Sequence, residues 1–279
     1  MPKIQKAKIE GVFLSLTDKC NLDCKYCYQS YSPTLNPYNE LKKEEWIKLI
    51  KGLKKLKIKK IRFIGGEPFL YKDFWDIVKY ANKERLEIKI FTNGTLLDEE
   101  LIKKVKECEA VLSFNLNSEK EGIQDFYQGK GNWRKTINAI KKCKKENVEF
   151  EIASPLTNKN IRSIEKFIGL CTNLGAKRIR FVPLILIGNA SVMGKDRPSK
   201  KQIKKLEKKI KNKKIEVTIG CRSCEAGINY LTIQSNGDVT PCSINKTILC
   251  NIRKTTIEKI INKIKKSNIK FKNICKDIK

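Results

Sequence analysis

Short apolar segments alternate with longer amphipathic segments along the first two thirds of this chain, and this alternation constrains its fold more than any other feature. The expected strands are residues 12–17, 60–64, 87–91, 110–116, 149–153 and 178–183. The expected helices lie between them, at 40–56, 74–85, 98–108, 133–146 and 160–174. Strands separated by helices of this length pair in parallel through right-handed crossovers. The sequence therefore predicts an α/β fold, a (β/α)6 partial TIM barrel, with ligands at the C-terminal ends of its strands.

The pattern changes after the sixth strand. Residues 187–198 have the composition of a linker, and a lysine-rich helix follows to about residue 214. Further on, two short strands flank Ser-Asn-Gly-Asp, which is a hairpin signal, and 257–266 is a final helix. We predict a barrel over 1–190, a linker and lysine-rich helix over 191–214, and a small cysteine-rich module over 215–279.

The charged residues restrict the possible chemistry. The chain contains no His, which excludes Ser-His and Cys-His nucleophile pairs and His-ligated metals. Lys and Arg number 60 against 30 Asp and Glu, for a net charge of +30, and only nine of the basic residues are Arg. A lysine bias is typical of a thermophilic source, and we interpret the charge as solvated helix faces. Nucleic acid is not the expected partner, because aromatic residues do not interleave with the lysines; an acidic peptide is the sharper alternative.

The N-terminal segment and the hydropathy pattern indicate where the chain resides. The first residues contain no signal-peptide pattern, and no apolar run is long enough to cross a membrane. We therefore expect a cytoplasmic protein whose cysteines are thiols. Only about ten residues precede the first strand, so we expect no separate leader-binding domain there.

Three of the 11 cysteines follow the first strand in the segment CNLDCKYC, as Cys20, Cys24 and Cys27. Three thiolates can hold three irons of a [4Fe–4S] cluster and leave the fourth iron open to another ligand. A zinc site completed by a remote residue is the alternative. Clustered cysteines in a reducing compartment indicate metal binding or catalysis before disulfides.

The next strand ends in Gly-Gly-Glu-Pro, where glycines allow close approach to the backbone and Glu67 offers a carboxylate to an amine. Together with C-x3-C-x-aromatic-C, this pattern resembles the radical S-adenosylmethionine (SAM) superfamily from about Val12 to Cys275. The resemblance implies a [4Fe–4S] cluster on the cysteine triplet, with the open iron binding the amino and carboxylate groups of SAM. It implies that Tyr26 lies by the adenine. The methionine amine would be held by Gly65, Gly66, Glu67 and Pro68.

Two further strand ends can be matched to this superfamily. Thr92 and Asn93 begin a Thr-Asn-Gly that resembles the family's motif near SAM. At the fourth strand, Asn115 and Asn117 replace a Ser and an Asp common in the family, and Gln128 replaces an Arg. Asn115 is nevertheless our candidate for a SAM contact there.

The C-terminal cysteines resemble the SPASM/twitch extension, which binds auxiliary [4Fe–4S] clusters. Five cysteines allow one auxiliary cluster rather than two. The expected ligands are Cys221, Cys224 and Cys242, with Cys275 preferred to Cys250 as the fourth. A small zinc knot is the alternative. Cys108, Cys143 and Cys171 lie near apolar positions and have no assigned function.

The resemblance implies an enzyme that cleaves SAM reductively to a 5′-deoxyadenosyl radical, which takes a hydrogen atom from a substrate. That substrate is a peptide or protein, or a cofactor precursor, and the electron donor is a ferredoxin or flavodoxin. The auxiliary cluster would aid electron transfer. The alternative is a non-catalytic iron–sulfur or zinc protein that binds nucleic acid or carries electrons. The sequence identifies no catalytic residue.

Overall fold

The computed structural model describes residues 8–31, 39–210, 214–220 and 226–266. These residues form two compact units. The first unit contains the described residues up to 20, those from 39 to 90, and those from 226 onward. The second contains 21–31 and the described residues from 91 to 220. Segments far apart in the sequence thus share a unit.

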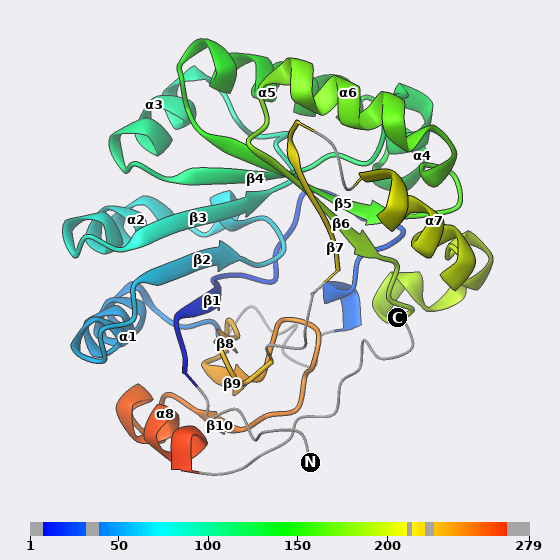
Figure 1. Cartoon of the computed structure of the whole chain (residues 1–279). Helices are drawn as coiled ribbons and strands as arrows, with labels where there is room; N and C mark the ends of the chain where they lie inside the picture. The colour runs from blue at the N-terminus through cyan, green and yellow to red at the C-terminus, as the bar shows by residue number, and fades with distance from the viewer. Residues whose placement is uncertain (1–7, 32–38, 211–213, 221–225, 267–279) are drawn as a thin grey trace. The chain divides into compact units, whose positions relative to one another are not determined.

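The sheet of the first unit has the strand order β10-β9-β8-β1-β2-β3. β1 and β2 pair in parallel, as do β2 and β3, while β8 to β10 form an antiparallel ribbon. The strands are β1 (Gly11–Ser15), β2 (Lys60–Ile64), β3 (Glu87–Thr92), β8 (Tyr230–Ile233), β9 (Asp238–Thr240) and β10 (Cys250–Asn251). The unit's helices are α1 (Lys43–Lys55), α2 (Phe74–Lys83) and α8 (Ile257–Lys266), with a short 3-10 turn, η3 (Pro68–Leu70), after β2 (Figure 1).

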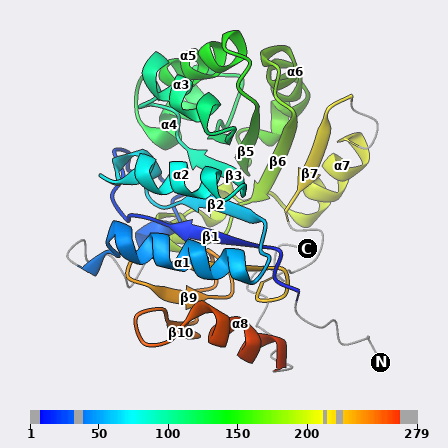
Figure 2. The same cartoon turned by 90° about the vertical axis from the view of Figure 1, so that its left-hand side faces the viewer.

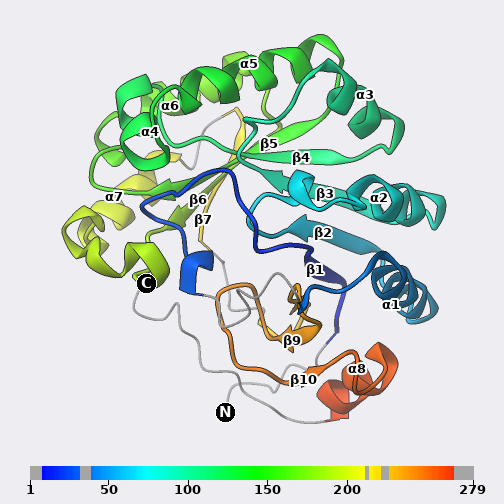
Figure 3. The ribbon, with the colours of Figure 1, turned by 180° about the vertical axis from the view of Figure 1, so that it is seen from behind.

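The second unit continues the alternation with four parallel strands in the order β4-β5-β6-β7. They are β4 (Val111–Asn115), β5 (Phe150–Leu156), β6 (Arg178–Pro183) and β7 (Glu216–Ile219). The helices are α3 (Glu99–Glu107), α4 (Glu121–Gln128), α5 (Asn132–Lys145), α6 (Ile164–Leu174) and α7 (Lys200–Ile210). Short 3-10 turns are η1 (Gln29–Tyr31), η4 (Ile161–Ser163), η5 (Gly188–Val192) and η6 (Gly194–Asp196). Figure 3 shows α5 and α6 on the outer side of β4 and β5.

The apolar periodicity explains why these elements form. Val12 and Leu14 of β1 are fully buried, as are Ile61 and Phe63 of β2. In α1 the buried positions are Trp46, Leu49, Ile50, Gly52 and Leu53, which make one face of a helix. The six expected strands are all present, close to their expected bounds.

The structure contains features that were not expected from the sequence. α4 is absent from the sequence prediction because its buried face includes Gln124 and Gln128, which hide its amphipathic pattern. β7 was not expected, and it pairs in parallel with β6. β8 is one of the two strands expected around Ser-Asn-Gly-Asp, but its parallel pairing with β1 was not expected. Both strands come from the range expected for the C-terminal module, so part of that range extends the parallel sheets.

The C-terminal residues pack directly against the first helix. α8 lies beside α1 (Figure 2). A Cβ added at Gly52 of α1 would lie 2.7 Å from Ile257 Cγ2 and 2.8 Å from Glu258 Oε1. Gly52 therefore gives α8 the room it occupies. No helix in the described part of the chain has the length and apolar content to cross a membrane.

We predict opposite effects for two Gly-to-Ala substitutions in helices. Gly52→Ala should lower the free energy of unfolding by about 1–3 kcal/mol, because overpacking against Ile257 outweighs the gain in helix propensity. Gly169→Ala in α6, where an added Cβ meets nothing within 4 Å, should raise it by up to about 1 kcal/mol. Urea denaturation followed by circular dichroism measures both. An equal stabilisation by the two substitutions would contradict the packing of α8 on α1.

Candidate functional site

The segment that leads from β1 into the cysteine loop is held by the Gly-Gly-Glu-Pro segment after β2. The Gly66 N–H donates to Thr17 O at 2.8 Å, and the Glu67 N–H donates to Lys19 O at 2.8 Å. The Leu16 N–H donates to Ile64 O at 3.1 Å, which extends the β1–β2 pairing to this point. The backbone just before Cys20 therefore lies against the backbone of residues 64–67.

Both glycines of this segment are required by that backbone contact. A Cβ on Gly65, whose φ is +154°, would lie 2.4 Å from Thr17 O, and one on Gly66 would lie 2.2 Å from Lys19 O. The sequence suggested that these glycines admit a ligand to the backbone, whereas in the structure their missing side chains leave room for residues 17–19, which follow β1. The Glu67 side chain is fully buried.

Two more contacts in the first unit hold the same segment. Thr17 Oγ1 donates to Glu40 Oε1 at 2.6 Å. Ser235 Oγ, from the hairpin between β8 and β9, donates to Asp18 Oδ2 at 2.8 Å. The C-terminal hairpin thus contacts the residues directly ahead of the cysteine triplet.

In the second unit, the residue after Cys20 is held by the Thr-Asn-Gly segment at the end of β3. Asn93 Nδ2 donates to Asn21 Oδ1 at 2.9 Å, and Asn21 Nδ2 donates to Thr95 Oγ1 at 2.8 Å. Thr92 Oγ1 accepts the Gly94 N–H at 3.0 Å. Gly94 has φ +77°, and a Cβ there would lie 2.8 Å from the Phe114 ring. The motif is thus a tight turn that positions the Asn93 amide.

Tyr26, the aromatic residue of the cysteine motif, is buried, and its hydroxyl has three amide partners. Asn117 Nδ2 donates to it at 2.8 Å and Gln128 Nε2 at 2.7 Å, while the hydroxyl donates to Asn115 Oδ1 at 3.0 Å. These are the three positions where the sequence departs from the common family pattern. The structure brings them together around one atom, a convergence that their spacing in the sequence does not reveal.

This network extends to a second layer and leaves one acceptor open. Gln124 Nε2 donates to Gln128 Oε1 at 2.8 Å, and Gln124 Oε1 accepts the Asn117 N–H at 2.8 Å. Asn117 Oδ1 is buried without a hydrogen-bond partner among the described residues. Burial, and then the charge of Cys24, raise the pKa of Tyr26 well above its usual value, so the phenol is neutral at physiological pH.

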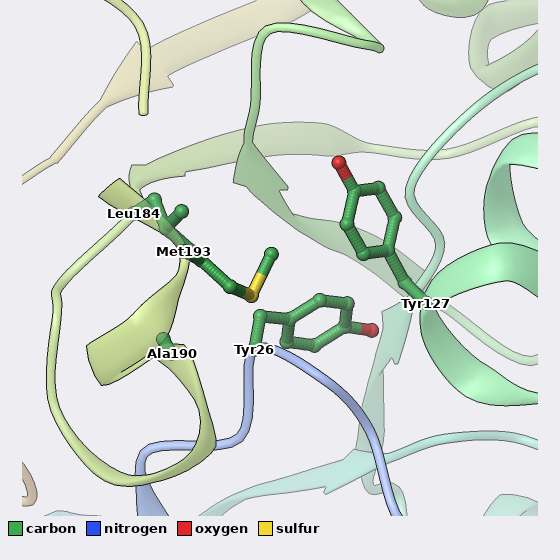
Figure 4. Packing of buried hydrophobic residues seen from close by; sticks show 5 residues of the cluster. All are labelled: Tyr26, Tyr127, Leu184, Ala190 and Met193. Carbon is green, nitrogen blue, oxygen red and sulfur yellow. The ribbon is translucent and has the colours of Figure 1, made fainter. Parts of the chain in front are cut away.

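An apolar cluster packs against the Tyr26 ring. Its buried members are Tyr26, Tyr127, Leu184, Ala190 and Met193 (Figure 4). The Tyr26 and Tyr127 ring centroids are 5.8 Å apart, and the Met193 side chain points toward Tyr26. Residues that follow β6 therefore cover the aromatic residue of the cysteine loop.

The cysteines of the triplet differ in exposure. Cys20 is exposed, and Cys24 and Cys27 are half-buried, with the Cys27 N–H donating to Cys24 O at 3.0 Å. Within the described residues, the structure does not gather three Cys, Asp or Glu side chains into a metal-binding group. Ligation by the triplet therefore stays a prediction.

The C-terminal ligand candidates are only partly visible. Cys242 follows β9, and its Sγ accepts the Asn245 N–H at 3.2 Å. Cys250 lies in β10, where burial raises the pKa of its thiol to about 11. Cys221, Cys224 and Cys275 lie outside the described residues. Cys108, Cys143 and Cys171 are buried thiols.

Two family models match this chain. The model of the radical SAM superfamily matches residues 14–171. The SPASM model, an iron–sulfur cluster-binding domain, matches residues 221–277. These matches identify the cofactors of the chain as a [4Fe–4S] cluster, SAM and auxiliary iron–sulfur clusters.

Individual proteins resemble the chain more distantly. It is 30% identical over 192 residues to Fe-coproporphyrin III synthase of Methanosarcina barkeri, covering 68% of this chain and 48% of that protein. It is 28% identical over 180 residues to sporulation killing factor maturation protein SkfB of Bacillus subtilis, covering 64% of this chain and 43% of the relative. The chain thus spans less than half the length of either relative.

Among solved structures, Streptococcus suis SuiB bound to precursor peptide SuiA superposes with a TM-score of 0.78. The match covers 96% of this chain and 68% of that one, at 14% identity. It confirms the expected fold class, an α/β partial barrel.

The residues present fit the implied cofactors. Three thiols in one loop are a donor set for iron and sulfide. The open Asn117 Oδ1 beside Tyr26 is a buried acceptor that a ligand hydroxyl or amine can satisfy. Sequence reasoning did not identify Gln124, because a polar residue on the buried face of α4 hides the apolar periodicity of that helix. It located Asn117 at a strand end but not its hydrogen bond to Tyr26, because the two residues are distant in the chain.

We predict that Tyr26→Phe destabilises the protein more than Tyr80→Phe, a change at a half-buried tyrosine. Removing the hydroxyl leaves the amides of Asn115, Asn117 and Gln128 without this partner in a buried site, which costs about 1–3 kcal/mol. Tyr80→Phe, which removes a single hydrogen bond to Glu84 on helix α2, should cost about 0.5 kcal/mol or less. Chemical denaturation of the cofactor-free proteins measures both. Equal losses would mean that the amide network does not depend on the phenol.

Proposed function

Because the chain belongs to the radical SAM superfamily, we propose that it is an enzyme that cleaves SAM reductively to take a hydrogen atom from a peptide, protein or cofactor precursor. One observation carries this proposal: the backbone on both sides of Cys20 is held by the motifs that would bind SAM. Gly66 and Glu67 bind residues 17–19, and Asn93 binds Asn21.

We assign the [4Fe–4S] cluster to Cys20, Cys24 and Cys27. When bound, this cluster supplies the electron that divides SAM into methionine and the 5′-deoxyadenosyl radical. The Glu67 carboxylate would accept the methionine amine, and Asn117 Oδ1 would accept a hydroxyl or amine of the cofactor. Tyr26 would present its ring, because its hydroxyl is fixed by Asn115, Asn117 and Gln128.

The auxiliary site belongs to the C-terminal cysteines in this proposal. Cys221, Cys224 and Cys242 hold one cluster, with Cys275 or Cys250 as the fourth ligand. A cluster with four protein ligands favours electron transfer, and one with an open iron favours substrate binding. We propose a cytoplasmic setting, with a ferredoxin or flavodoxin as electron donor. In support, the cysteines in the described part of the chain are reduced.

The substrate side of the proposal rests on a basic and aromatic surface. Phe126 is 45% exposed, and the Nζ atoms of Lys25 and Lys159 each lie 4.6 Å from its ring centroid. Lys25 comes from the cysteine loop, Phe126 from α4, and Lys159 from the segment after β5. These segments follow the C-terminal ends of strands, where barrel enzymes bind substrate. Two ammonium groups around an exposed ring suit a substrate that carries carboxylates and an apolar surface.

We favour an acidic peptide as that substrate, because the surface is basic; the SkfB relative is named a maturation protein of a sporulation killing factor. A carboxylate-bearing tetrapyrrole is the second candidate, because the chain is 30% identical to an Fe-coproporphyrin III synthase. Both share the carboxylate chemistry that Lys25 and Lys159 would recognise.

The first test is made on protein purified and reconstituted without oxygen. We expect about eight iron per chain, and 5′-deoxyadenosine after dithionite and SAM are added. The variant with Cys20, Cys24 and Cys27 all changed to Ala should keep about four iron and form no 5′-deoxyadenosine. Cys143→Ala, which removes a buried thiol away from the motif, is the control and should keep both properties.

Other outcomes have distinct meanings. About four iron with continued 5′-deoxyadenosine formation would remove the auxiliary cluster from the proposal. Zinc in place of iron, with no SAM binding, would contradict the proposed enzymatic activity and support the non-catalytic alternative.

The second test addresses the substrate surface. The double variant Lys25→Glu/Lys159→Glu should weaken binding of an Asp- and Glu-rich peptide by about tenfold at low salt, because two attractions become repulsions. Lys51→Glu is the matched control, since Lys51 also lies over an aromatic ring, that of the half-buried Tyr80, but on the outer helices. It should change binding by less than about twofold.

Titration calorimetry measures each affinity, and Fe-coproporphyrin III serves as the second probe. If only the porphyrin is bound in a lysine-dependent way, the cofactor-precursor candidate replaces the peptide. If the double variant and the control behave alike with both probes, the surface has no role in recognition.

A further inference from the structure

The segment after β6 has the composition of a linker, but the structure packs it onto the cysteine loop. Its first turn, η5, begins at Gly188. Asn189, the second residue of that turn, contacts the backbone of two cysteines of the triplet. The segment and the part of the loop that it contacts, residues 23–30, belong to the second unit.

Asn189 holds the loop through its backbone and its side chain. Its N–H lies 3.0 Å from Cys27 O and 2.8 Å from Ser30 Oγ, and it donates to both. Its side-chain Nδ2 donates to Cys24 O at 3.1 Å and to Asp23 Oδ1 at 2.8 Å. Asn189 therefore binds residues from Asp23 to Ser30, and it fixes the backbone carbonyls of Cys24 and Cys27.

The preceding glycine is required for this contact. Gly188 has φ +59°, in the left-handed region that favours glycine. A Cβ at this position would lie 2.5 Å from Cys27 O and 2.6 Å from Ser30 Oγ. Any other residue would push the segment away from the loop.

The rest of the segment approaches the loop from its apolar side. Ala190 is fully buried and Met193 is 7% exposed, and both pack in the cluster that contains Tyr26 (Figure 4). The segment thus contacts Cys24, Tyr26 and Cys27. The remaining residue, Lys25, is held by a hydrogen bond from its N–H to Tyr127 O at 2.9 Å.

We propose that Asn189 is a positioning residue that orders the cysteine loop before the cluster binds and slows loss of the cluster afterwards. This inference rests on the proposed function, in which the triplet holds a cluster. Its physical basis is preorganisation: groups that orient the ligands of a metal commonly change its affinity by about 10- to 100-fold when they are removed. The hydrogen bonds of Asn189 go to two carbonyls, a hydroxyl and a carboxylate, and none goes to a thiol, so its effect is on the shape of the loop.

The experiment compares Asn189→Ala and the isosteric Asn189→Asp with Asn158→Ala. Asn158 is a matched control, because its Nδ2 donates to two carbonyls of the same post-β6 segment, Lys195 O at 2.8 Å and Arg197 O at 3.2 Å. It therefore removes similar bonds without touching the cysteine loop. Thermal unfolding confirms that each variant is folded.

Three measurements are made on each variant. In the cofactor-free protein, the alkylation rates of Cys24 and Cys27 by iodoacetamide are followed by mass spectrometry. In the reconstituted protein, transfer of iron to a chelator is timed, with the variant lacking Cys20, Cys24 and Cys27 giving the background from the auxiliary site. The electron paramagnetic resonance spectrum of the reduced protein is recorded with and without SAM.

Both Asn189 variants should release iron from the triplet about tenfold faster than wild type. They should also alkylate severalfold faster and show an altered spectral response to SAM. Asn158→Ala should match wild type in all three measurements. Asn189 variants that match wild type would overturn the inference while leaving the proposed function intact. A wild-type triplet that takes up no iron would overturn the proposed function instead, and the alkylation rates alone would then decide whether Asn189 orders the loop.

Discussion

The constraint on which the site depends is that three thiols must be presented from eight consecutive residues with no regular secondary structure. Such a loop cannot hold its own shape, because its backbone groups have few partners within it. Its partners come from the ends of three strands. Gly66 and Glu67 after β2 bind the approach to Cys20, Asn93 after β3 binds Asn21, and Asn189 after β6 binds the residues around Cys24 and Cys27.

Glycine and asparagine do this work for complementary reasons. Glycine allows backbone to lie against backbone, which Gly66 and Gly188 require at distances that a Cβ would prevent. Asparagine offers both a donor and an acceptor on a short side chain, so it can bind a carbonyl or another amide without adding charge. Three further hydrogen bonds to this segment end on carboxylates, those of Glu40, Asp18 and Asp23.

The Tyr26 hydroxyl is bound by uncharged amide groups. Burying an Asp and an Arg requires that their desolvation be offset by well-aligned partners. Asn115, Asn117 and Gln128 fill the three positions with amides, whose burial costs less once they are hydrogen-bonded. Recognition beside Tyr26 then depends on hydrogen-bond direction and shape. The open Asn117 Oδ1 is the atom of this network to which a ligand would donate a hydrogen bond.

The strands could be predicted from the sequence because local apolar periodicity determines them, and the cysteine, glycine and Thr-Asn-Gly motifs could be located because each is contiguous. What could not be predicted is the set of contacts between distant segments. The helix α4 was not predicted, because Gln124 and Gln128 place polar atoms on its buried face. The contact of Asn189 with the cysteine loop was not predicted, because its segment has a linker composition. The Gly-Asn pair at 188–189 is nevertheless a signal for a positive φ and a close approach of the backbone.

The pairing of β8 with β1 has a consequence for the auxiliary site. Cys242 follows β9, which pairs with β8, and β8 in turn pairs with the strand that leads into the cysteine triplet. Arg253 adds a bidentate contact to Glu45 of α1, at 2.7 and 3.1 Å. Because the free energy of binding a metal centre is also free energy of folding, a cluster ligated by Cys242 would stabilise this hairpin. Through β8 and Ser235 it would also order the end of β1, so loading of the auxiliary site would help to form the approach to the triplet rather than act as an independent event.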